Sequence, residues 1–379
     1  MSFPVSACRS LPVLMYHYIS RYRGSIAVSP ETFEAHCRGM AEAGWRGVGL
    51  DEAEAFFLEG APLPARSALI TFDDGFLDNY VYAWPILKKY GHKGVVFAVT
   101  RRLGTDGAVR PTLEDVWSGR IAATDLPPVD APMRRDELGH EQRHDLFLSW
   151  EEARRMEASG VMAVAAHTAT HHAIYAAPIF PGPGEGARVR TPRGHGNTFY
   201  IVDGPTPWGL PLFRERPAMH SQAFLPSPHL LDIVQSVVPQ GDERQAHAFF
   251  QNPANVERLM ARIDALSPEE MGAMESDEAR EARIRSELSE CAATLARELG
   301  HPVRSLCWPW GRGSDVARAE ARKLGFSVFF ETRMGANPPG ASVAVRRFKA
   351  RDKSWAWLRL RLALYSRPWL AGLYARARI

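Results

Sequence analysis

Two adjacent carboxylates follow a short apolar segment in the first quarter of the chain. Residues 67–72 predict a buried strand, and this strand leads directly into Asp73-Asp74-Gly75. Neighbouring side chains point in different directions, so one carboxylate can bind a cation while the other accepts a proton from water. The same residues are also typical of a simple turn that caps a helix. The acidic pair therefore needs support from other residues before it indicates a reaction centre.

Histidines provide that support. His167, His171 and His172 come directly after the apolar residues 161–166, which predict another strand. His167 and His171 can converge on one ion if the turn between them is helix-like. Two neutral imidazoles and one carboxylate make a good zinc site that leaves positions for water and substrate. An isolated histidine is more often a core or surface residue, but this grouping favours a metal site.

Two further segments carry weaker signals. Pro309-Trp310-Gly311 follows the predicted strand 303–308, and its proline and glycine predict a tight turn. Such a turn can direct a backbone N–H towards a developing oxyanion, although many turns have no catalytic role. His17 stands at the end of the predicted strand 11–16, and on its own it is more often structural.

The segments that carry these residues alternate with helical patterns. This alternation predicts βα units with a parallel sheet or barrel, in which active sites lie at the carboxyl ends of the strands. The predicted strands are residues 11–16, 45–50, 67–72, 94–99, 161–166, 303–308, 326–331 and 343–348. The predicted helices are residues 30–43, 51–60 with Asp51 as the cap, 78–90, 149–159, 276–299 and 314–324.

A long insertion interrupts this pattern. Residues 178–228 contain 10 prolines and 7 glycines, a density that excludes regular helices and central strands. Aromatic residues are interspersed there. The segment is therefore either a loose surface insertion or an ordered lid or cleft wall beside the active site. We expect a barrel domain over residues 1–350 that is interrupted by an insertion at 176–275, and a tail at 351–379.

The tail is basic and rich in aromatic residues. From residue 346 onward, ten arginines and lysines stand against the single acid Asp352, although the whole chain has a net charge of only +3. Pro368 is expected to divide the tail into two short helices. Such a composition fits a basic amphipathic helix at a membrane interface, or a terminal helix that packs on the barrel with its arginines in solvent. Nucleic-acid binding is not expected, because no binding module accompanies the charge.

Composition places the chain among ordinary globular proteins. It has 379 residues, of which 45% are hydrophobic and 23% charged. Its four cysteines are scattered without a C-x-x-C pair, which argues against a disulfide framework or a zinc finger. The first twenty residues hold no signal-peptide core, and no run of apolar residues is long enough to span a membrane. We therefore expect a cytoplasmic protein, with peripheral contact to the inner membrane face through the tail.

In their order along the chain, these segments resemble the polysaccharide deacetylases, the NodB-homology or carbohydrate esterase 4 family. T-F-D-D-G at residues 71–75 matches the first motif of that family, H-T-x-x-H at 167–171 matches the second, and W-P-W-G at 308–311 resembles the third. L-M-Y-H at 14–17 is similar to a circularly permuted branch that includes the poly-N-acetylglucosamine de-N-acetylases. The resemblance covers about residues 10–175 and 280–350.

The resemblance implies a fold and a set of roles. The fold would be a distorted (β/α) barrel with fewer than eight repeats. The metal, most plausibly Zn²⁺, would be held by Asp74, His167 and His171. Asp73 would be the general base and His17 the general acid. The backbone N–H of Trp310 would contribute to the oxyanion hole, and the residues expected to contact substrate are Trp310, Pro309 and Arg347.

Two departures from the family pattern bear on these roles. Many members carry an arginine two residues before the proline of the third motif, where it orients the base. Cys307 occupies that position here, and Arg304 and Arg347 are the arginines nearby in sequence. No leucine-x-histidine segment lies near the C-terminus. This second departure favours His17 as the acid.

The expected function is metal-dependent hydrolysis of the N-acetyl group of an amino sugar in a glycan or glycolipid. A lipid-linked or lipopolysaccharide-type intermediate is the favoured substrate because it is available in the cytoplasm. The alternatives are a deacetylase of exported exopolysaccharide, peptidoglycan or a chitin-like polymer, a hydrolase of a small cyclic amide, and a non-catalytic glycan-binding module with a vestigial site.

Overall fold

The centre of the molecule is a parallel sheet that curves into a nearly closed barrel. The computed structural model describes residues 7–135, 137, 141–178, 189–192 and 206–377. The strands follow the order β16-β15-β14-β9-β6-β5-β1-β17, and β4 pairs with β5. These strands are β1 Val13–Tyr16, β4 Arg46–Gly47, β5 Ser67–Asp74, β6 Gly94–Ala98, β9 Met162–Ala166, β14 Ser305–Cys307, β15 Val328–Glu331, β16 Val345–Arg346 and β17 Phe348–Lys349. The predicted distorted (β/α) barrel is confirmed.

The two edges of the sheet belong to one short segment. β16 pairs with β15 at one edge, while β17 pairs with β1 at the other. Only Arg347 separates β16 from β17, so the predicted strand 343–348 is interrupted at this residue. The segment therefore closes the barrel, and Arg347 lies at the closure point.

Side chains along each strand alternate between two apolar layers, as the period of two in a strand requires. One layer fills the barrel interior with residues from every side, namely Val13, Leu69, Val95, Phe97, Ala165, Cys307, Phe330 and Val345. The other layer packs against the surrounding helices and includes Leu14, Ile70, Val96, Leu306 and Phe329. In β5 this alternation places Leu69, Thr71 and Asp73 on the interior side.

Helices surround the sheet close to the predicted positions. They are α1 Pro30–Glu42, α2 Leu50–Glu59, α3 Trp84–Lys89, α5 Trp150–Ala158, α10 Asp277–Leu299 and α11 Asp315–Lys323. The expected cap Asp51 is wrong, since α2 begins one residue earlier after Gly49, whose N–H donates to Glu52. The predicted helix 78–90 starts as a π-helix, Asn79–Ala83, before α3. Pro85 has no N–H for an ordinary helical bond, which explains the wider turn.

Smaller elements join the barrel strands. β2 Tyr18–Ile19 pairs with β3 Ala27–Val28, and β7 Met133–Arg135 pairs with β8 Glu141–Arg143. The remaining short helical segments between β6 and β7 are η2 Thr100–Arg102, α4 Leu113–Trp117 and η3 Ala123–Asp125.

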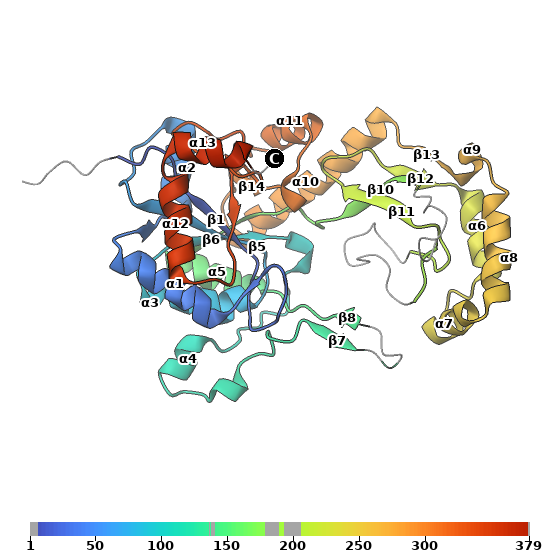
Figure 1. The fold of residues 1–379 in the computed structure, drawn as a ribbon, viewed down its shortest axis with the longest axis horizontal. Helices are drawn as coiled ribbons and strands as arrows, with labels where there is room; N and C mark the ends of the chain where they lie inside the picture. Colours follow the sequence, from blue (N-terminus) through green and yellow to red (C-terminus); the bar gives the residue numbers. More distant parts are fainter. Residues whose placement is uncertain (1–6, 136, 138–140, 179–188, 193–205, 378–379) are drawn as a thin grey trace, which may run out of the picture.

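The described part of the insertion has its own apolar core. Strand β10 Ala173–Pro178 pairs with β11 Phe213–Pro217, and β12 Phe224–Pro226 pairs with β13 Gly272–Met274. The helices are α6 Pro228–Val237, α7 Glu243–Gln251, α8 Pro253–Asp264 and α9 Pro268–Met271. Leu230, Val234 and Leu259 are fully buried among them. The strands belong to two-stranded sheets, as the prolines require, and α6 to α8 lie on the side away from the barrel (Figure 1).

The tail forms the two expected helices, α12 Trp355–Tyr365 and α13 Pro368–Arg376. α12 is part of the main core, where Leu358 and Leu362 are fully buried. His36 Nε2 donates to the carbonyl of Lys353 at 2.7 Å and so ties the start of α12 to α1. Trp369 and Leu373 remain 66% and 57% exposed. Within the described residues, no helix is long and apolar enough to cross a membrane.

Candidate active site

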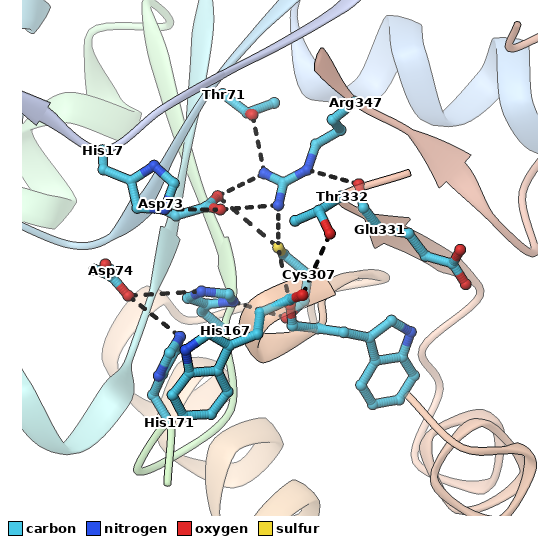
Figure 2. A network of polar contacts seen from close by, with 12 residues as sticks. His17, Thr71, Asp73, Asp74, His167, His171, Cys307, Glu331, Thr332 and Arg347 are labelled. Atoms are coloured by element: carbon cyan, nitrogen blue, oxygen red, sulfur yellow. Dashed lines mark hydrogen bonds and ion pairs between the residues drawn. The ribbon is translucent and has the colours of Figure 1, made fainter. Parts of the chain in front are cut away.

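The acidic pair lies where β5 ends. Asp73 continues the interior row of the strand, whereas Asp74 adopts a positive φ of 77°. The change in backbone direction turns the Asp74 carboxylate away from the barrel axis and towards the loop after β9 (Figure 2). Both residues are only 3% exposed. The predicted separation of two neighbouring carboxylates is thus achieved by the backbone.

Asp74 and two histidines form a compact group of potential metal ligands. Asp74 Oδ1 lies 3.7 Å from His167 Nε2 and 3.5 Å from His171 Nε2 (Figure 2). Ligands around a tetrahedral zinc ion at about 2.0–2.2 Å stand roughly 3.3–3.6 Å apart. Asp74 Oδ1 is buried and accepts no hydrogen bond from any described residue. The three side chains therefore fit a divalent cation.

Hydrogen bonding fixes the orientation of His167. Its Nδ1 lies 2.8 Å from the carbonyl oxygen of Cys307, which can only accept, so Nδ1 carries the proton. The lone pair is then on Nε2, which faces Asp74. Metal-binding histidines commonly use this arrangement. Burial lowers the pKa of His171 well below its usual value, which keeps the ring of His171 neutral.

The turn that brings the two histidines together is not helix-like, so that expectation is wrong. Thr168 and His171 have φ values of 66° and 57°. Asp74 and Trp310 complete the set of non-glycine residues with positive φ in the described part of the chain. All four therefore lie in the site motifs. Left-handed backbone is costly for such residues, and for β-branched Thr168 in particular, and it concentrates at functional sites.

Asp73 is bound by Arg347 through two hydrogen bonds. Arg347 Nη1 donates to Oδ1 at 2.6 Å and Nη2 to Oδ2 at 2.8 Å (Figure 2). Burial would raise the pKa of Asp73, but Arg347 and the nearby His167 and His17 together lower it. The carboxylate is therefore ionised and held in one orientation.

This contact corrects the role expected for Arg347. Its side chain is 0% exposed and is occupied by Asp73, Thr71 and the carbonyl of Glu331, so no part of it is available to a substrate. Arg347 instead holds Asp73, the predicted base, in one orientation. The family pattern gives this role to an arginine at the position of Cys307. Arg304 is exposed and lies at the opposite end of β14.

Cys307 lies between these groups. Its sulfur accepts from Arg347 Nη2 at 2.9 Å and lies 3.8 Å from Asp73 Oδ1. Asp73, His167 and Cys307 thus form a second group close enough to hold a metal. Burial raises the pKa of Cys307 well above its usual value, and the adjacent guanidinium would repel a cation. The group around Asp74 is therefore the better cation site.

His17 lies on the far side of Asp73 from Arg347. Its Nε2 is 3.8 Å from Asp73 Oδ2, and its side chain is 17% exposed. Asn79 Nδ2 donates to the backbone carbonyl of His17 at 3.0 Å and fixes this turn. Burial lowers the pKa of His17 below its usual value, and the two aspartates offset this only in part. The residue is thus near both carboxylates and partly open to solvent.

The third motif forms a tight turn, Pro309–Gly311, in which Trp310 has a φ of 52°. The ring of Trp310 is 38% exposed and lies 4.3 Å from the His171 ring. Its position fits the predicted wall of a sugar pocket. Pro309, however, is buried, so its predicted contact with substrate does not fit. Gly311 has no room for a side chain, since a Cβ would lie 2.3 Å from the Thr332 nitrogen.

Arg102 also lies at the site, although the motifs did not predict it. Its Nη1 lies 3.8 Å from Asp74 Oδ1, and its side chain is 9% exposed. The available signal was the position of Arg102 just after the predicted strand 94–99, at the same edge as the acidic pair.

Two sequence comparisons match part of the chain. Residues 60–179 match the family described as polysaccharide deacetylase. YxkH of Bacillus subtilis (strain 168), whose name also refers to polysaccharide deacetylases, is 39% identical over 94 residues. That alignment spans 25% of this chain and 33% of the length of YxkH.

Solved structures share the fold over most of the chain. IcaB from Ammonifex degensii is 19% identical with a TM-score of 0.54, and 93% of this chain and 97% of that chain are covered. A de-N-acetylase from Aggregatibacter actinomycetemcomitans is 18% identical with a TM-score of 0.55, covering 93% and 99%. The BpsB deacetylase domain from Bordetella bronchiseptica is 20% identical with a TM-score of 0.53, covering 92% and 98%. The segment that matches the polysaccharide deacetylase family carries Asp73, Asp74, His167 and His171, and the solved structures share the fold of the chain.

Proposed function

We propose that this chain is a de-N-acetylase, which hydrolyses the N-acetyl group of an amino sugar in a glycan or glycolipid and releases acetate. The proposal depends on one observation: the two neighbouring carboxylates have different contacts. Asp74 points at two imidazoles without a hydrogen bond to its Oδ1 from the described residues, while Asp73 is fixed by Arg347. Metal-assisted amide hydrolysis uses a cation site and a separate base, and this arrangement offers residues for both.

The chain's own residues account for the proton movements. A divalent cation held by Asp74, His167 and His171 would lower the pKa of a water molecule and polarise the acetyl carbonyl. Asp73 accepts the proton of the attacking water, since each of its oxygens keeps a second lone pair besides the one that Arg347 uses. His17 donates a proton to the departing amine as the C–N bond breaks. The backbone N–H of Trp310 is the predicted donor to the oxyanion.

Acetate release under metal control tests this function. We expect the purified protein to release acetate from N-acetylglucosamine oligosaccharides. Acetate release should stop after treatment with a chelator and resume on addition of Zn²⁺. Cobalt and nickel in parallel samples test the metal, because the same ligands accept them. Stoichiometric metal binding without acetate release from any acetylated sugar would instead support the glycan-binding module with a vestigial site.

We also propose that the substrate is presented at a membrane surface, as a lipid-linked or lipopolysaccharide-type glycan, and that α13 contacts the lipid. Trp369 and Leu373 are four residues apart on one face of α13 and are both exposed. Arg376 extends the same region and is also exposed. Exposed aromatic and aliphatic side chains beside arginines suit an interface with anionic lipid. Contact from the cytoplasmic side stays the prediction made from the sequence.

Flotation with vesicles of phosphatidylglycerol and phosphatidylethanolamine tests the membrane contact. The unmodified protein should float, and Trp369→Ala/Leu373→Ala should remain at the bottom. Trp117→Ala/Leu225→Ala removes two other exposed apolar side chains and serves as the matched control. Equal flotation of all three proteins, or of none, would contradict the proposed role of α13.

A further inference from the structure

A cleft rich in arginine lies next to the candidate active site. It has a volume of about 630 Å³ and is formed by the loop after β14, the start of α11, the end of β15, the start of α10 and the insertion. Its charged walls are Arg280, Arg312, Arg318 and Arg333, with Asp315, Glu331 and His220. Four guanidinium groups against two carboxylates leave the cleft with a positive charge when His220 is neutral.

The acidic residues do not neutralise all of these arginines. Arg318 uses both carboxylates, with Nη1 2.8 Å from Asp315 and Nη2 3.3 Å from Glu331. Among the residues that the structure describes, exposed Arg312 and Arg333 form no ion pair. The Nε atoms of Arg280 and Arg318 are buried and have no hydrogen-bond partner in the described part of the chain. The cleft thus offers unused donors and unpaired positive charge.

The cleft and the candidate active site share structural elements. Gly311 lines the cleft and directly follows Trp310, whose ring contacts His171. Glu331 links the two on the other side, because its carbonyl accepts from Arg347 Nε at 3.2 Å while its carboxylate pairs with Arg318 in the cleft. The cleft therefore adjoins both the turn that carries Trp310 and the strand end that contacts Arg347.

Resting on the proposed function, we propose that this cleft binds a phosphate group carried by the substrate beyond the acetylated sugar. Guanidinium forks bind phosphate through paired hydrogen bonds, and several of them around one anion favour a doubly charged group. The first turn of α11, at Asp315 and Val316, also lines the cleft, and the amino end of a helix favours a bound anion. The substrate class is thus a phosphorylated glycan, which includes both sugar phosphates and lipid-linked sugar phosphates.

The test compares two substrates that differ only in phosphate. The probes are a di-N-acetylated glucosamine disaccharide with a free reducing end and the same disaccharide with a 1-phosphate. Arg312→Ala/Arg333→Ala should lower kcat/KM for the phosphorylated probe about 10- to 100-fold and for the neutral probe less than about 3-fold. Lys93→Ala/Arg304→Ala removes two exposed cations at the amino ends of β6 and β14, opposite the site, and should leave both values unchanged.

Further outcomes separate the alternatives. An equal loss on both probes, or the same loss in the control variant, overturns the proposal. Preference for a carboxymethyl analogue over the phosphorylated probe also overturns it. The disaccharide joined through diphosphate to a prenyl chain distinguishes the two sources of phosphate. If the prenyl-linked disaccharide has the higher kcat/KM and loses the larger share of it in Arg312→Ala/Arg333→Ala, the bound phosphate belongs to a lipid headgroup. Equal kcat/KM values for the prenyl-linked and the soluble phosphorylated disaccharide indicate a soluble sugar phosphate.

Failure of the proposed function gives a different result. If neither disaccharide is deacetylated, calorimetry with the intact protein still decides the question of the cleft. The phosphorylated probe should bind at least about 10-fold more tightly than the neutral one, and Arg312→Ala/Arg333→Ala should abolish that difference. Equal binding of both probes by the unmodified protein overturns the phosphate site.

Discussion

Asp73 and Asp74 are neighbours in sequence and equally buried, yet their surroundings are opposite. Asp73 points into the barrel, where Arg347 donates to both of its oxygens. Asp74 turns out of the strand through a positive φ and faces two imidazole nitrogens, with Arg102 at 3.8 Å. A carboxylate neutralised by a bound guanidinium is a poor cation ligand, whereas one surrounded by neutral imidazoles is a good one. The backbone direction of one residue therefore separates the proposed cation site from the proposed base.

Removing the charge of Asp74 should have the largest effect. Asp74→Asn is expected to lower metal affinity strongly and acetate release about 1,000-fold or more, because the remaining imidazoles hold a cation less well. Metal analysis after gel filtration, alongside acetate release, measures both. If Asp74→Asn keeps one metal per chain and full turnover, Asp74 is not the metal ligand that distinguishes it from Asp73.

The same change one residue earlier should separate binding from chemistry. Asp73→Asn is expected to keep the metal and to reduce kcat about 100- to 10,000-fold, since a neutral amide cannot accept the water proton. Equal metal content in Asp73→Asn and the unmodified protein, together with lost turnover, would support separate roles for Asp74 in metal binding and for Asp73 in proton transfer. Loss of the metal in both variants would show instead that the two carboxylates act as one ligand set.

Arg347 provides a milder test of the same division. Arg347→Lys keeps the charge but loses the paired hydrogen bonds, and we expect kcat to fall about 10- to 100-fold with unchanged metal content. Arg347→Met leaves Asp73 buried without a cation, which should cost about 3–5 kcal/mol in the free energy of unfolding. Adding Asp73→Asn to Arg347→Met should recover much of that stability. Denaturant unfolding of the single and double variants measures this coupling.

The pH profile separates positioning from a merely structural role. Without Arg347, the pKa of Asp73 should rise, because burial then dominates. The acidic limb of the rate profile of Arg347→Lys should therefore move less than that of Arg347→Met. Identical profiles in both variants would indicate that Arg347 only stabilises the barrel closure.

The sequence predicted the site residues that directly follow strands. It did not predict the contact that forms only when the barrel closes. Asp73, Asp74 and His167 follow apolar segments that form parallel strands, so their meeting at one edge could be expected. The partnership of Arg347 with Asp73 could not, because it requires β16 and β17 to join opposite edges of the sheet.

Local backbone geometry set a second limit on prediction. Thr168 adopts a left-handed conformation that β-branched residues rarely take, so a helix-like turn was the natural but wrong expectation. Likewise, proline in the third motif predicted a turn correctly but did not reveal that Pro309 is buried. The α6–α8 helices of the insertion were not anticipated, since they pack around their own cluster rather than the barrel core.

Asp78 is a third buried carboxyl group to compare with Asp73 and Asp74. Its substitution should have the smallest effect of the changes considered. Burial raises its pKa well above the usual value, and Asp145 and Asp130 reinforce this, while hydrogen bonds from Ile19 and Asn79 oppose it. Asp78 is therefore neutral in the folded protein at pH values where the unfolded chain is ionised. This group's contribution to stability is present below the pKa of the unfolded chain, about 3.9, and is lost as the pH rises towards the folded value.

Asp78→Asn should remove this dependence while keeping an acceptor for Asn79 Nδ2, which donates to Asp78 Oδ1 at 2.6 Å. The free energy of unfolding of the variant, relative to the unmodified protein, should increase by roughly 1 kcal/mol or more between pH 5 and pH 7. Acetate release should change less than about two-fold, because Asp78 touches neither the predicted metal ligands nor the base. A stability difference independent of pH would mean that Asp78 is ionised like Asp73. The presence of the Arg347 guanidinium beside Asp73 would then not explain why one buried carboxyl group is charged and the other neutral.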